Sequence, residues 1–522
     1  MKLRYFKSIL PAALFCASLG ITSCIGDLDV EPIDPSVTLE FYQDEVFYKI
    51  YATMGLTGQK GPDGNGDVDG IDEGTSGFFR LIWNMNELST DEAMCSWGDP
   101  GIPEMNFVSW TSSHDQVKGL YSRLTYDVTL CNHFLEKTEG MTDEKTVRQR
   151  AEARFMRAMN YYYLLDFFGN VPFSEVVINE CPPQISRAEL FAYVEKELSE
   201  CEGDMYAPGQ APYGRADQAA NWLLRSRLYL NAQVYTGNAR WSDAATYAEK
   251  VMTSRYQLAD NYQHLFMADN DGSSVNNAQV EIILPICADG VKTRSWASSL
   301  FIIASTHTSG MINWGTTEGW GGNRARAALV QKFFPDGKIP ADADLTDLST
   351  LGDERALFYA FERTVDITKT TDFKQGLSVT KFSNVRADGK PSNDTQFPDM
   401  DIPFFRTAEA YLTYAEATLR AGGSSQNALD AVNEIRSRAN AKPLVSIDLL
   451  KVLDEKCREF FFEGHRRTDL IRYGYFGGSA EYRWDWKGGA INGTQFDKIY
   501  NLLPIPASDL NANPNLVQNP GY

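Results

Sequence analysis

Residues 151–165 read AEARFMRAMNYYYLL and set the pattern for much of the chain. Small and apolar side chains recur in this stretch every three or four positions, at Ala151, Phe155, Ala158, Met159, Tyr162 and Leu165. That spacing places them on one face of an α-helix and predicts that this face is buried. The pattern stops at Gly169-Asn170-Val171-Pro172, where a glycine followed by a proline is typical of a helix end.

A second periodic segment follows further along the chain. Residues 219–230 carry another apolar stripe, Gly237 interrupts it, and Trp241 opens a further segment with alanines at Ala244 and Ala248. Small side chains allow two helices to approach closely. A helix, a short turn and a second helix with small residues between them are typical of tetratricopeptide-like helix pairs.

A similar pair recurs later in the chain. Ala408–Leu419 and Ala428–Arg438 are periodic segments separated by Gly422-Gly423. The intervening residues 257–400 are rich in Gly, Asn, Asp and Thr, and their regular pattern is limited to short strand-like runs such as Val280–Ile286 and Ser299–Ala304.

The sequence therefore predicts a mainly α protein of degenerate tetratricopeptide-like helix pairs. We expect these pairs to form a scaffold mainly over residues 120–256 and 404–475. Loop-rich regions mainly over residues 57–115 and 257–400 would form the binding face, because loops on a rigid scaffold commonly carry binding residues.

The N-terminus has the pattern of an export signal. Three basic residues, Lys2, Arg4 and Lys7, precede the mostly apolar Ser8–Ile21, which is too short to span a bilayer core of ~30 Å as a helix. It ends in Ile21-Thr22-Ser23-Cys24, the pattern of a bacterial lipoprotein box. We expect cleavage after residue 23, lipidation of Cys24, and one mature domain over residues 24–522. The alternative is plain secretion.

Composition and motifs exclude several classes of protein. The formal net charge is −20, from 49 basic and 69 acidic residues, which argues against nucleic-acid binding. The spacing of the 8 cysteines shows no disulfide framework. Most are expected to be buried and free, with a Cys181–Cys201 bond left open. The chain has 5 histidines and no local catalytic or zinc motif. A pair of glycosidase carboxylates stays possible among so many acidic residues.

Residues 459–474, EFFFEGHRRTDLIRYG, resemble the helix signature of the RagB/SusD family of outer-membrane lipoproteins. LPIP at 503–506 and QNPGY at 518–522 resemble the terminal signature of that family. The likeness to starch-binding members extends over nearly the whole chain and includes the loop Gly58–Gly77. Within the signature we expect Glu463 and Arg467 to form an i,i+4 salt bridge. We also expect Arg466 and Asp469 to join the helix to a loop.

The resemblance implies a non-catalytic glycan-binding lipoprotein on the outer surface of the outer membrane. It also implies that the protein captures starch or malto-oligosaccharides and passes them to a SusC-like TonB-dependent transporter. The same role for another glycan or for a peptide is the alternative hypothesis. A glycoside hydrolase is a third.

Sugars present apolar faces and hydroxyl edges, so a glycan site combines aromatic planes with polar groups. The resemblance assigns the planes to tryptophans in three loops, Trp97, Trp296 and Trp320, and the polar contacts to Asp72, Arg80 and Asp99. Starch-binding members have a tyrosine in place of Trp296 and an asparagine where this chain has Pro100 beside Asp99.

The alternative for each tryptophan taken alone is a place in the core. We expect that place for Trp222 and Trp241, which lie on helix-pair faces, and structural roles for Trp484 and Trp486.

A calcium site is a further expectation from the resemblance. Asp269-Asn270-Asp271-Gly272 resembles the start of a calcium-binding loop, because it clusters hard oxygen ligands. The glutamate expected at the twelfth position is absent, with Val280 in its place, so an EF-hand is not supported. The expected ligands of a structural calcium ion are Asp271, Asp399 and Asp401. The alternative is a capped, solvated turn.

Overall fold

The computed structural model describes residues 40–334 and 347–522. The predicted signal peptide, residues 1–23, and the predicted lipidation site Cys24 lie outside the described residues. The chain divides into a first unit, Met1–Gln43, and a second compact unit, Asp44–Tyr522. The second unit contains both predicted helical blocks and both predicted loop-rich regions.

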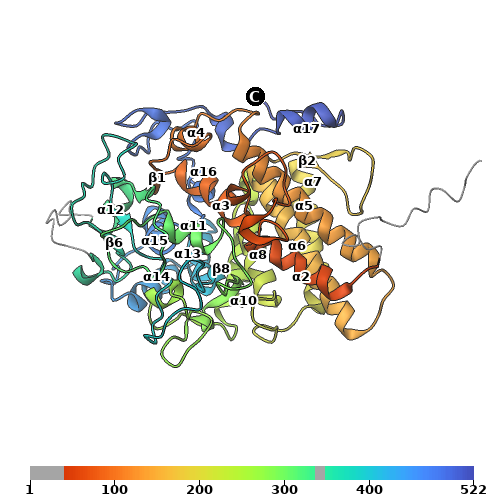
Figure 1. Cartoon of the computed structure of the whole chain (residues 1–522), viewed down its shortest axis with the longest axis horizontal. Helices are drawn as coiled ribbons and strands as arrows, with labels where there is room; N and C mark the ends of the chain where they lie inside the picture. Colours follow the sequence, from red (N-terminus) through yellow and green to blue (C-terminus); the bar gives the residue numbers. More distant parts are fainter. Residues whose placement is uncertain (1–39, 335–346) are drawn as a thin grey trace, which may run out of the picture. The chain divides into compact units, whose positions relative to one another are not determined.

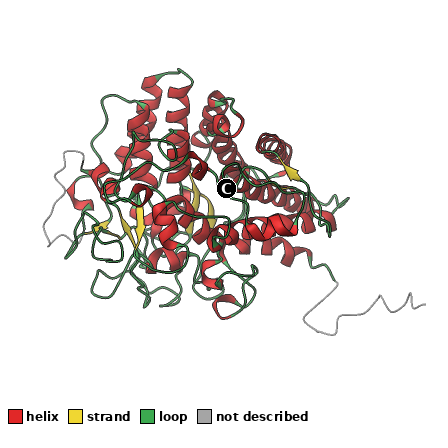
Figure 2. Ribbon diagram, turned by 90° about the horizontal axis from the view of Figure 1, so that it is seen from above, coloured by secondary structure: helices red, strands yellow, loops and turns green. Residues whose placement is uncertain are grey.

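Helices dominate the described chain (Figures 1 and 2). The α-helices are α2 (Gln43–Gly55), α3 (Phe78–Trp83), α4 (Ile102–Phe107), α5 (Asp115–Lys137), α6 (Glu144–Phe167), α7 (Arg187–Cys201), α8 (Gln218–Leu230), α9 (Ala232–Thr236), α10 (Trp241–Met252), α11 (Ser299–Ala304), α12 (Ala327–Phe333), α13 (Thr407–Arg420), α14 (Ser425–Arg438), α15 (Leu449–Phe460), α16 (Arg466–Arg472) and α17 (Ala507–Ala512). The prediction of a mainly α protein is confirmed.

The strands are short and form two-stranded antiparallel ribbons, drawn in yellow in Figure 2. The pairs are β1 (Ala93–Cys95) with β5 (Asn323–Ala325), β2 (Val171–Pro172) with β3 (Gln184–Ile185), β4 (Ile282–Ile286) with β8 (Ile402–Arg406), and β6 (Phe358–Tyr359) with β7 (Ser378–Val379). In the β1–β5 and β4–β8 ribbons the partners are more than 100 residues apart in the sequence, so these two ribbons join distant segments.

The helices pack as pairs in chain order. Helix α5 packs on α6, α6 on α7, α8 on α10, and α13 on α14. The α8–α10 and α13–α14 pairs are those that the periodicity predicts. The two predicted helical blocks meet where α10 packs against α13. Alanines at the centre of this second block, among them Ala408, Ala415 and Ala428, are fully buried. Their small size is what lets the helix axes come close.

Helix ends follow the local chemistry of the sequence. Asp143 caps α6 by accepting a hydrogen bond from the Thr146 N–H at 3.0 Å, which satisfies a donor that a helix start leaves free. Asp217 caps α8 in the same way. Gly169 follows the end of α6 with a φ of 75°, a conformation that glycine adopts without strain.

One of the two strand-like runs is a helix. Ser299–Ala304 forms α11 and is wholly buried, so that prediction is wrong, whereas Ile282–Ile286 forms β4 as expected. A short, continuous apolar run carries no periodicity that separates a buried strand from a buried helix, and only its packing decides between them.

Two tryptophans predicted for the core are only half-buried. The Trp222 indole N–H donates to Glu202 Oε1 at 2.7 Å, and the Lys250 ammonium lies 5.2 Å from its ring centroid. The Arg420 guanidinium lies 5.9 Å from the ring of Trp241. Charged side chains cover part of each ring, so these two positions lie at the rim of the helix pairs. Trp484 is buried, as expected for a structural role.

The predicted Glu463–Arg467 salt bridge does not form. Helix α15 ends at Phe460 and α16 begins at Arg466, because Phe462 and Gly464 have φ values of 64° and 83°. The two residues are therefore not one helical turn apart. Glu463 pairs with Arg406 at 2.7 Å instead, and Arg467 donates to the Asn501 carbonyl at 2.9 Å.

The six cysteines in the described part of the chain are all free. Cys181 is exposed and Cys201 is buried, so the open possibility of a disulfide between them is not realised. Cys95, Cys131 and Cys457 are buried as expected, whereas Cys287 is exposed.

None of the helices within residues 40–334 and 347–522 has the length and apolar character needed to cross a membrane.

Candidate functional site

The three tryptophans assigned to sugar contact lie in one row. Trp320 occupies the middle, with its ring centroid 6.4 Å from that of Trp97 and 6.3 Å from that of Trp296. Adjacent rings are tilted by 54° and 48°. All three side chains are half-buried, so each combines an anchored part with an exposed part. We call Trp97, Trp296 and Trp320 the tryptophan row.

The β1–β5 ribbon brings two members of the row together. Cys95 pairs with Asn323, and the Ser96 N–H donates to the Gly322 carbonyl at 3.0 Å. Trp97 leaves the end of β1 and Trp320 precedes β5, so antiparallel pairing places their loops side by side. The row therefore depends on a contact between segments more than 200 residues apart in the sequence.

Helix α11 positions the other side of the row. Trp296 lies just before α11, and its ring packs against a buried cluster with Leu300, Ala304 and Phe397. The backbone N–H of Trp320 donates to the Ala304 carbonyl at 2.8 Å, at the C-terminal end of α11. A helix leaves its last carbonyls without partners, and here the loop that carries Trp320 satisfies one of them.

Each indole N–H in the row already has a partner within the protein. Trp97 donates to the Gly321 carbonyl at 2.8 Å, Trp296 to the Pro62 carbonyl at 3.1 Å, and Trp320 to Glu318 Oε2 at 2.9 Å. These bonds hold the ring planes before any ligand arrives. The row therefore offers ring surfaces, rather than N–H donors, to a ligand.

Close packing against glycine fixes Trp97. A Cβ at Gly322 would lie 2.3 Å from Cε2 of the Trp97 indole, a distance that no side chain tolerates. The ring therefore rests directly on the backbone at this position, and Gly322 is required for sterics rather than for backbone conformation.

Arg80 brings positive charge to the row. Its Nη1 donates to the Gly74 carbonyl at 2.8 Å, and its guanidinium lies 5.8 Å from the centroid of the Trp97 ring. Burial lowers the pKa of Arg80, and the charges of Asp72 and Asp99 oppose that shift. The three predicted polar residues thus act on one another electrostatically.

The two acidic residues differ in their local roles. Asp72 is exposed and accepts hydrogen bonds at 3.0 Å from the N–H and the hydroxyl of Thr75. Both residues lie near the end of the loop Gly58–Gly77. Asp99 is exposed, next to the exposed Pro100. Both carboxylates are open to solvent, as hydroxyl-binding groups at the edge of a site would be.

Sequence reasoning missed the residues that support the row from behind. Glu318 accepts from Trp320 through Oε2 and from the Gln396 amide through Oε1 at 2.9 Å. Phe397 is buried with its ring centroid 5.0 Å from that of Trp296. Glu318 lies two residues before Trp320, so its proximity was readable. Nothing in the local sequence links residues 396 and 397 to this row.

The predicted calcium ligands do not complete a site as placed. Asp401 is buried, and its oxygens accept from the Ala288 N–H and the Tyr213 hydroxyl, both at 2.7 Å. Burial, with the charges of Asp271 and Asp289, raises its pKa to about 7. Asp399 Oδ1 is buried without a hydrogen-bond partner. Across residues 40–334 and 347–522, no group of three or more His, Cys, Asp or Glu side chains could hold a metal ion.

Sequence comparisons identify the family. The sequence profile of the SusD family matches residues 357–522. The starch-binding protein SusD of Bacteroides thetaiotaomicron is 48% identical to this chain, over 100% of both proteins. The chain belongs to the SusD family.

Solved structures share the SusD-family fold. A SusD-like carbohydrate binding protein from Bacteroides fragilis has a TM-score of 0.71 at 22% identity, covering 91% of this chain and 98% of that chain. Surface glycan-binding protein A from Bacteroides thetaiotaomicron, in complex with laminarihexaose, has a TM-score of 0.66 at 18% identity, covering 91% and 98%. At these identities the likeness concerns the fold alone.

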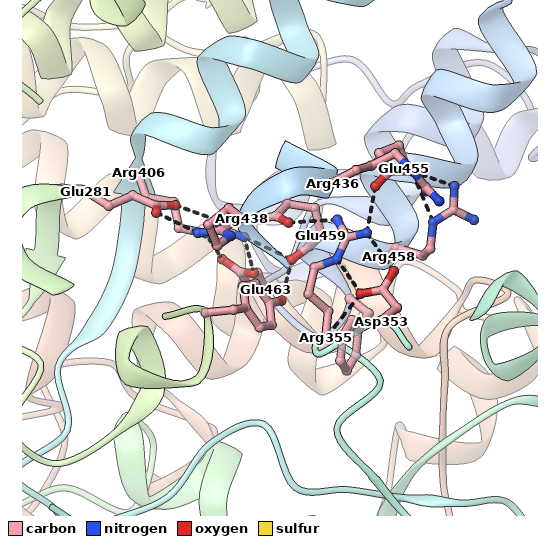
Figure 3. A network of polar contacts seen from close by, with 12 residues as sticks. Glu281, Asp353, Arg355, Arg406, Arg436, Arg438, Glu455, Arg458, Glu459 and Glu463 are labelled. Atoms are coloured by element: carbon pink, nitrogen blue, oxygen red, sulfur yellow. Dashed lines mark hydrogen bonds and ion pairs between the residues drawn. The ribbon is translucent and has the colours of Figure 1, made fainter. Parts of the chain in front are cut away.

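The SusD-family signature lies in a buried network of ions (Figure 3). Glu459 contacts three arginines from separate segments: Arg406 Nη1 at 2.6 Å, Arg355 Nη1 at 3.0 Å, and Arg438. Arg406 also pairs with Glu281 at 2.8 Å. These groups join β8, α14 and α15 to the loop-rich region, so the signature stabilises the scaffold.

Arg466 and Asp469 of the signature also make buried ion pairs. Arg466 Nε lies 2.7 Å from Asp91 Oδ1, in the loop before β1, so the expected link from helix to loop is confirmed for this residue. Asp469 pairs with Lys456 at 3.3 Å and with Arg472, and these contacts connect α16 to α15 and to its own next turn rather than to a loop.

Proposed function

We propose that this protein is a non-catalytic surface lipoprotein that binds starch-like α-1,4-glucans and passes them to a TonB-dependent outer-membrane transporter. The observation that carries the proposal is the tryptophan row, with its three half-buried rings about 6 Å apart and its N–H groups already bonded. The 48% identity to a starch-binding protein over the full chain supports the choice of ligand.

The physical basis is the fit between a sugar chain and a tilted row of rings. Each sugar buries an apolar C–H face on an indole, while Arg80, Asp72 and Asp99 are available to its hydroxyl edges. Tilts of 54° and 48° between neighbouring rings favour a ligand that bends along its length. A chain of α-1,4-linked glucose bends in this way, so the row selects the shape of the polymer.

Affinity electrophoresis in gels containing amylopectin tests this function. We expect retarded migration of the wild-type protein and loss of retardation in Trp320→Ala and Trp296→Ala. Removing one ring costs about 1.5–3 kcal/mol of buried apolar contact, a roughly tenfold to hundredfold loss of affinity. Trp486→Ala serves as a control, because this half-buried ring lies outside the row. Unretarded wild-type protein would refute the starch assignment.

A different glycan is the second candidate. Two features near the row favour it: Trp296 is larger than the tyrosine expected from starch-binding relatives, and the exposed Pro100 offers no side-chain hydrogen bond. Calorimetry against glucans, fructans, xylans and peptides separates the two. Incubation with maltoheptaose, followed by chromatography, tests the non-catalytic assignment, since shorter products would reveal a hydrolase.

The anchor and the transporter belong to the same proposal. Labelling of cells with a radioactive fatty acid should mark the wild-type protein and not Cys24→Ala. Protease treatment of intact cells should degrade a protein that faces outward. Co-purification of the transporter with the tagged protein would support the partnership, and its absence after mild solubilisation would count against it.

A further inference from the structure

Three cavities lie in series beside the loop that precedes α8. The first, of about 390 Å³, is lined by residues that include Trp222, Lys250 and Arg255. The second, of about 340 Å³, shares Arg255 with the first, and its walls include residues 209 and 211–215. We call these two cavities together the loop groove. Volumes of this size are typical of ligand sites.

A third cavity extends the series to the chain segment that precedes Trp296. This cavity, of about 180 Å³, shares Gly214 and Pro285 with the second and also includes Thr293. Thr293 is three residues before Trp296 and is held in the same turn by a hydrogen bond from its N–H to Asp289 Oδ1 at 2.9 Å. Cavities that share lining residues therefore run from Trp222 on α8 to Thr293, three residues before Trp296.

The first cavity has the kinds of groups that the tryptophan row has. Trp222 is half-buried, and its N–H is bonded to Glu202, so its orientation is fixed without a ligand. Thr253, Ser254 and Arg255 line the same space. The Thr253 and Ser254 hydroxyls donate to the carbonyls of Glu249 and Val251, so to a ligand they offer their oxygens as acceptors. An aromatic plane with polar groups around it suits a sugar.

The walls of the second cavity are held in place by the protein itself. Arg255 Nη1 donates to the Gly209 carbonyl at 2.8 Å, and Tyr256 donates to Asp217 Oδ2 at 2.8 Å. Tyr213 is 46% exposed and donates its hydroxyl hydrogen to Asp401. A loop fixed at both ends loses little freedom when a ligand binds.

The charge of the groove fits a neutral chain better than an acidic one. Lys250 is paired with Glu202 at 3.7 Å, and Arg215 with Glu152 at 2.5 Å. Arg255 takes part in no ion pair with the described residues, and Nη1 of its exposed guanidinium donates to the Gly209 carbonyl. Its other N–H groups can donate to the hydroxyl groups of a ligand. One unpaired cation among aromatic and hydroxyl groups is a weak site for an acidic peptide.

We propose that the loop groove is a second contact for the same glycan chain that the tryptophan row holds. This inference rests on the proposed function. A polymer long enough to follow the series of cavities binds both places on one molecule, and the second contact forms at high effective concentration. A short oligosaccharide on the row gains little from the groove.

The test compares a polymer with a short ligand in the same variants. In Trp222→Ala and Arg255→Ala we expect the affinity for amylopectin to fall about tenfold, while the affinity for maltoheptaose changes less than about twofold. Trp241→Ala, which changes a half-buried tryptophan on the same helix pair outside the groove, should match the wild type on both ligands. Thermal melts show which variants are folded, and they are needed for Arg255→Ala because this change also removes the hydrogen bond to the Gly209 carbonyl.

The outcomes separate this inference from the proposed function. One outcome is that the wild type binds both ligands, Trp320→Ala binds neither, and the groove variants keep wild-type affinity for amylopectin. That outcome overturns the groove proposal and leaves the proposed function standing. If the wild type binds neither ligand, the proposed function and the groove proposal are both refuted. Equal losses on maltoheptaose and amylopectin in Arg255→Ala would also overturn the groove, because they indicate a general effect on the row.

Discussion

At the scale of single residues, the site depends on how the three rings are held as well as on their presence. Trp320 lies between two other rings, and Glu318 fixes its plane through a 2.9 Å hydrogen bond. Glu318 is fixed in turn by Gln396. A ring that is already in position loses little freedom on binding, and preorganisation of this kind raises affinity without adding a contact.

Removing the support of Trp320 should therefore weaken binding although the ring remains. We expect Glu318→Ala to lower the affinity for maltoheptaose about fivefold, since about 1 kcal/mol is typical for one hydrogen bond. Glu318→Gln, which can still accept from the indole, is the matched control and should lose less. Calorimetry measures both. Equal affinities in Glu318→Ala and the wild type would show that Glu318 does not position the ring.

A second residue-scale feature is a pair of buried carboxyl groups behind β1. Glu87 accepts from the Gly464 and His465 N–H groups at 2.6 and 3.2 Å, and lies within hydrogen-bond reach of Glu92. Oε2 of each residue is buried and receives no other hydrogen bond. Burial raises the pKa of Glu87 against the hydrogen bonds from the Gly464 and His465 N–H groups. Burial also raises the pKa of Glu92 to about 7, against the charge of Arg466.

This pair should make the protein less stable as the pH rises. The folded state retains a proton that the unfolded chain has released above about pH 4.3. The stabilisation is present below that pH and is lost as the pH rises toward 7. In Glu92→Gln the free energy of unfolding should fall less steeply with pH, by up to about 1.4 kcal/mol per pH unit. Urea melts between pH 5 and 8 measure it.

The difference between wild type and variant is the quantity that matters in these melts. Asp127 and Asp401 also titrate near pH 7, since burial raises both pKa values to about 7. They contribute equally to both proteins. Identical slopes for the wild type and Glu92→Gln would exclude proton sharing between Glu87 and Glu92.

At the scale of elements, short ribbons and loop ends build the site on the helical scaffold. The β1–β5 ribbon has three paired positions, yet it decides where Trp97 and Trp320 meet. The end of α11 receives the Trp320 loop. An element this small gains its stability from the packing around it rather than from its own propensity.

The ribbon makes binding sensitive to one methyl group. In Gly322→Ala the new Cβ would lie 2.3 Å from the Trp97 indole, so the ring must move. We expect the affinity for maltoheptaose to fall as much as in Trp97→Ala, by roughly tenfold. Gly98→Ala, where a Cβ meets nothing within 4 Å, is the control. Wild-type binding by Gly322→Ala would show that the position of Trp97 is unimportant.

At the scale of the whole molecule, the buried ion network joins the loop-rich region to the helical scaffold. Glu459 is fully buried, and burial alone would raise its pKa. The charges of Arg438, Arg406 and Arg355 outweigh this effect and hold the pKa of Glu459 well below its usual range. Its contribution to stability is present above the unfolded pKa and is lost only as the pH falls through the folded value.

Removing the centre of this network should destabilise the entire fold. Glu459→Ala leaves three buried guanidinium groups without their shared partner, and we expect a loss of about 3–5 kcal/mol in the free energy of unfolding. Lys451→Ala on the same helix, which removes a solvent-exposed ion pair, should cost less than about 1 kcal/mol. Chemical denaturation compares them. A similar small loss in both would assign the network no role in stability.

Calcium binding stays a prediction at this scale. Asp271, Asp399 and Asp401 form no preformed metal site, so calcium would have to draw them together with backbone oxygens. Calcium at 100 times its dissociation constant would then add about 2.7 kcal/mol to stability. Thermal melts with calcium, with magnesium and with EDTA measure the effect. Asp399→Asn should abolish it. No difference between calcium and EDTA would refute the site.

Local sequence determined the elements of this protein. The apolar stripe from Ala151 to Leu165 and the Gly-Pro helix end after it predicted α6. The small residues Ala408 and Ala428 predicted the α13–α14 pair. These predictions were possible because periodicity, caps and side-chain size act over a few residues. The likeness to a family supplied the three loop tryptophans together. Ser299–Ala304 was misread as a strand, since a short apolar run has no period to distinguish the two structures.

Tertiary structure alone decided the contacts between distant segments. The order of the tryptophan row, the support of Trp296 by Phe397 and the replacement of a Glu463–Arg467 bridge by a Glu463–Arg406 bridge all join residues that local pattern cannot relate. Such contacts depend on the summed packing of the chain, in which burial and charge pairing favour one arrangement over the local alternatives.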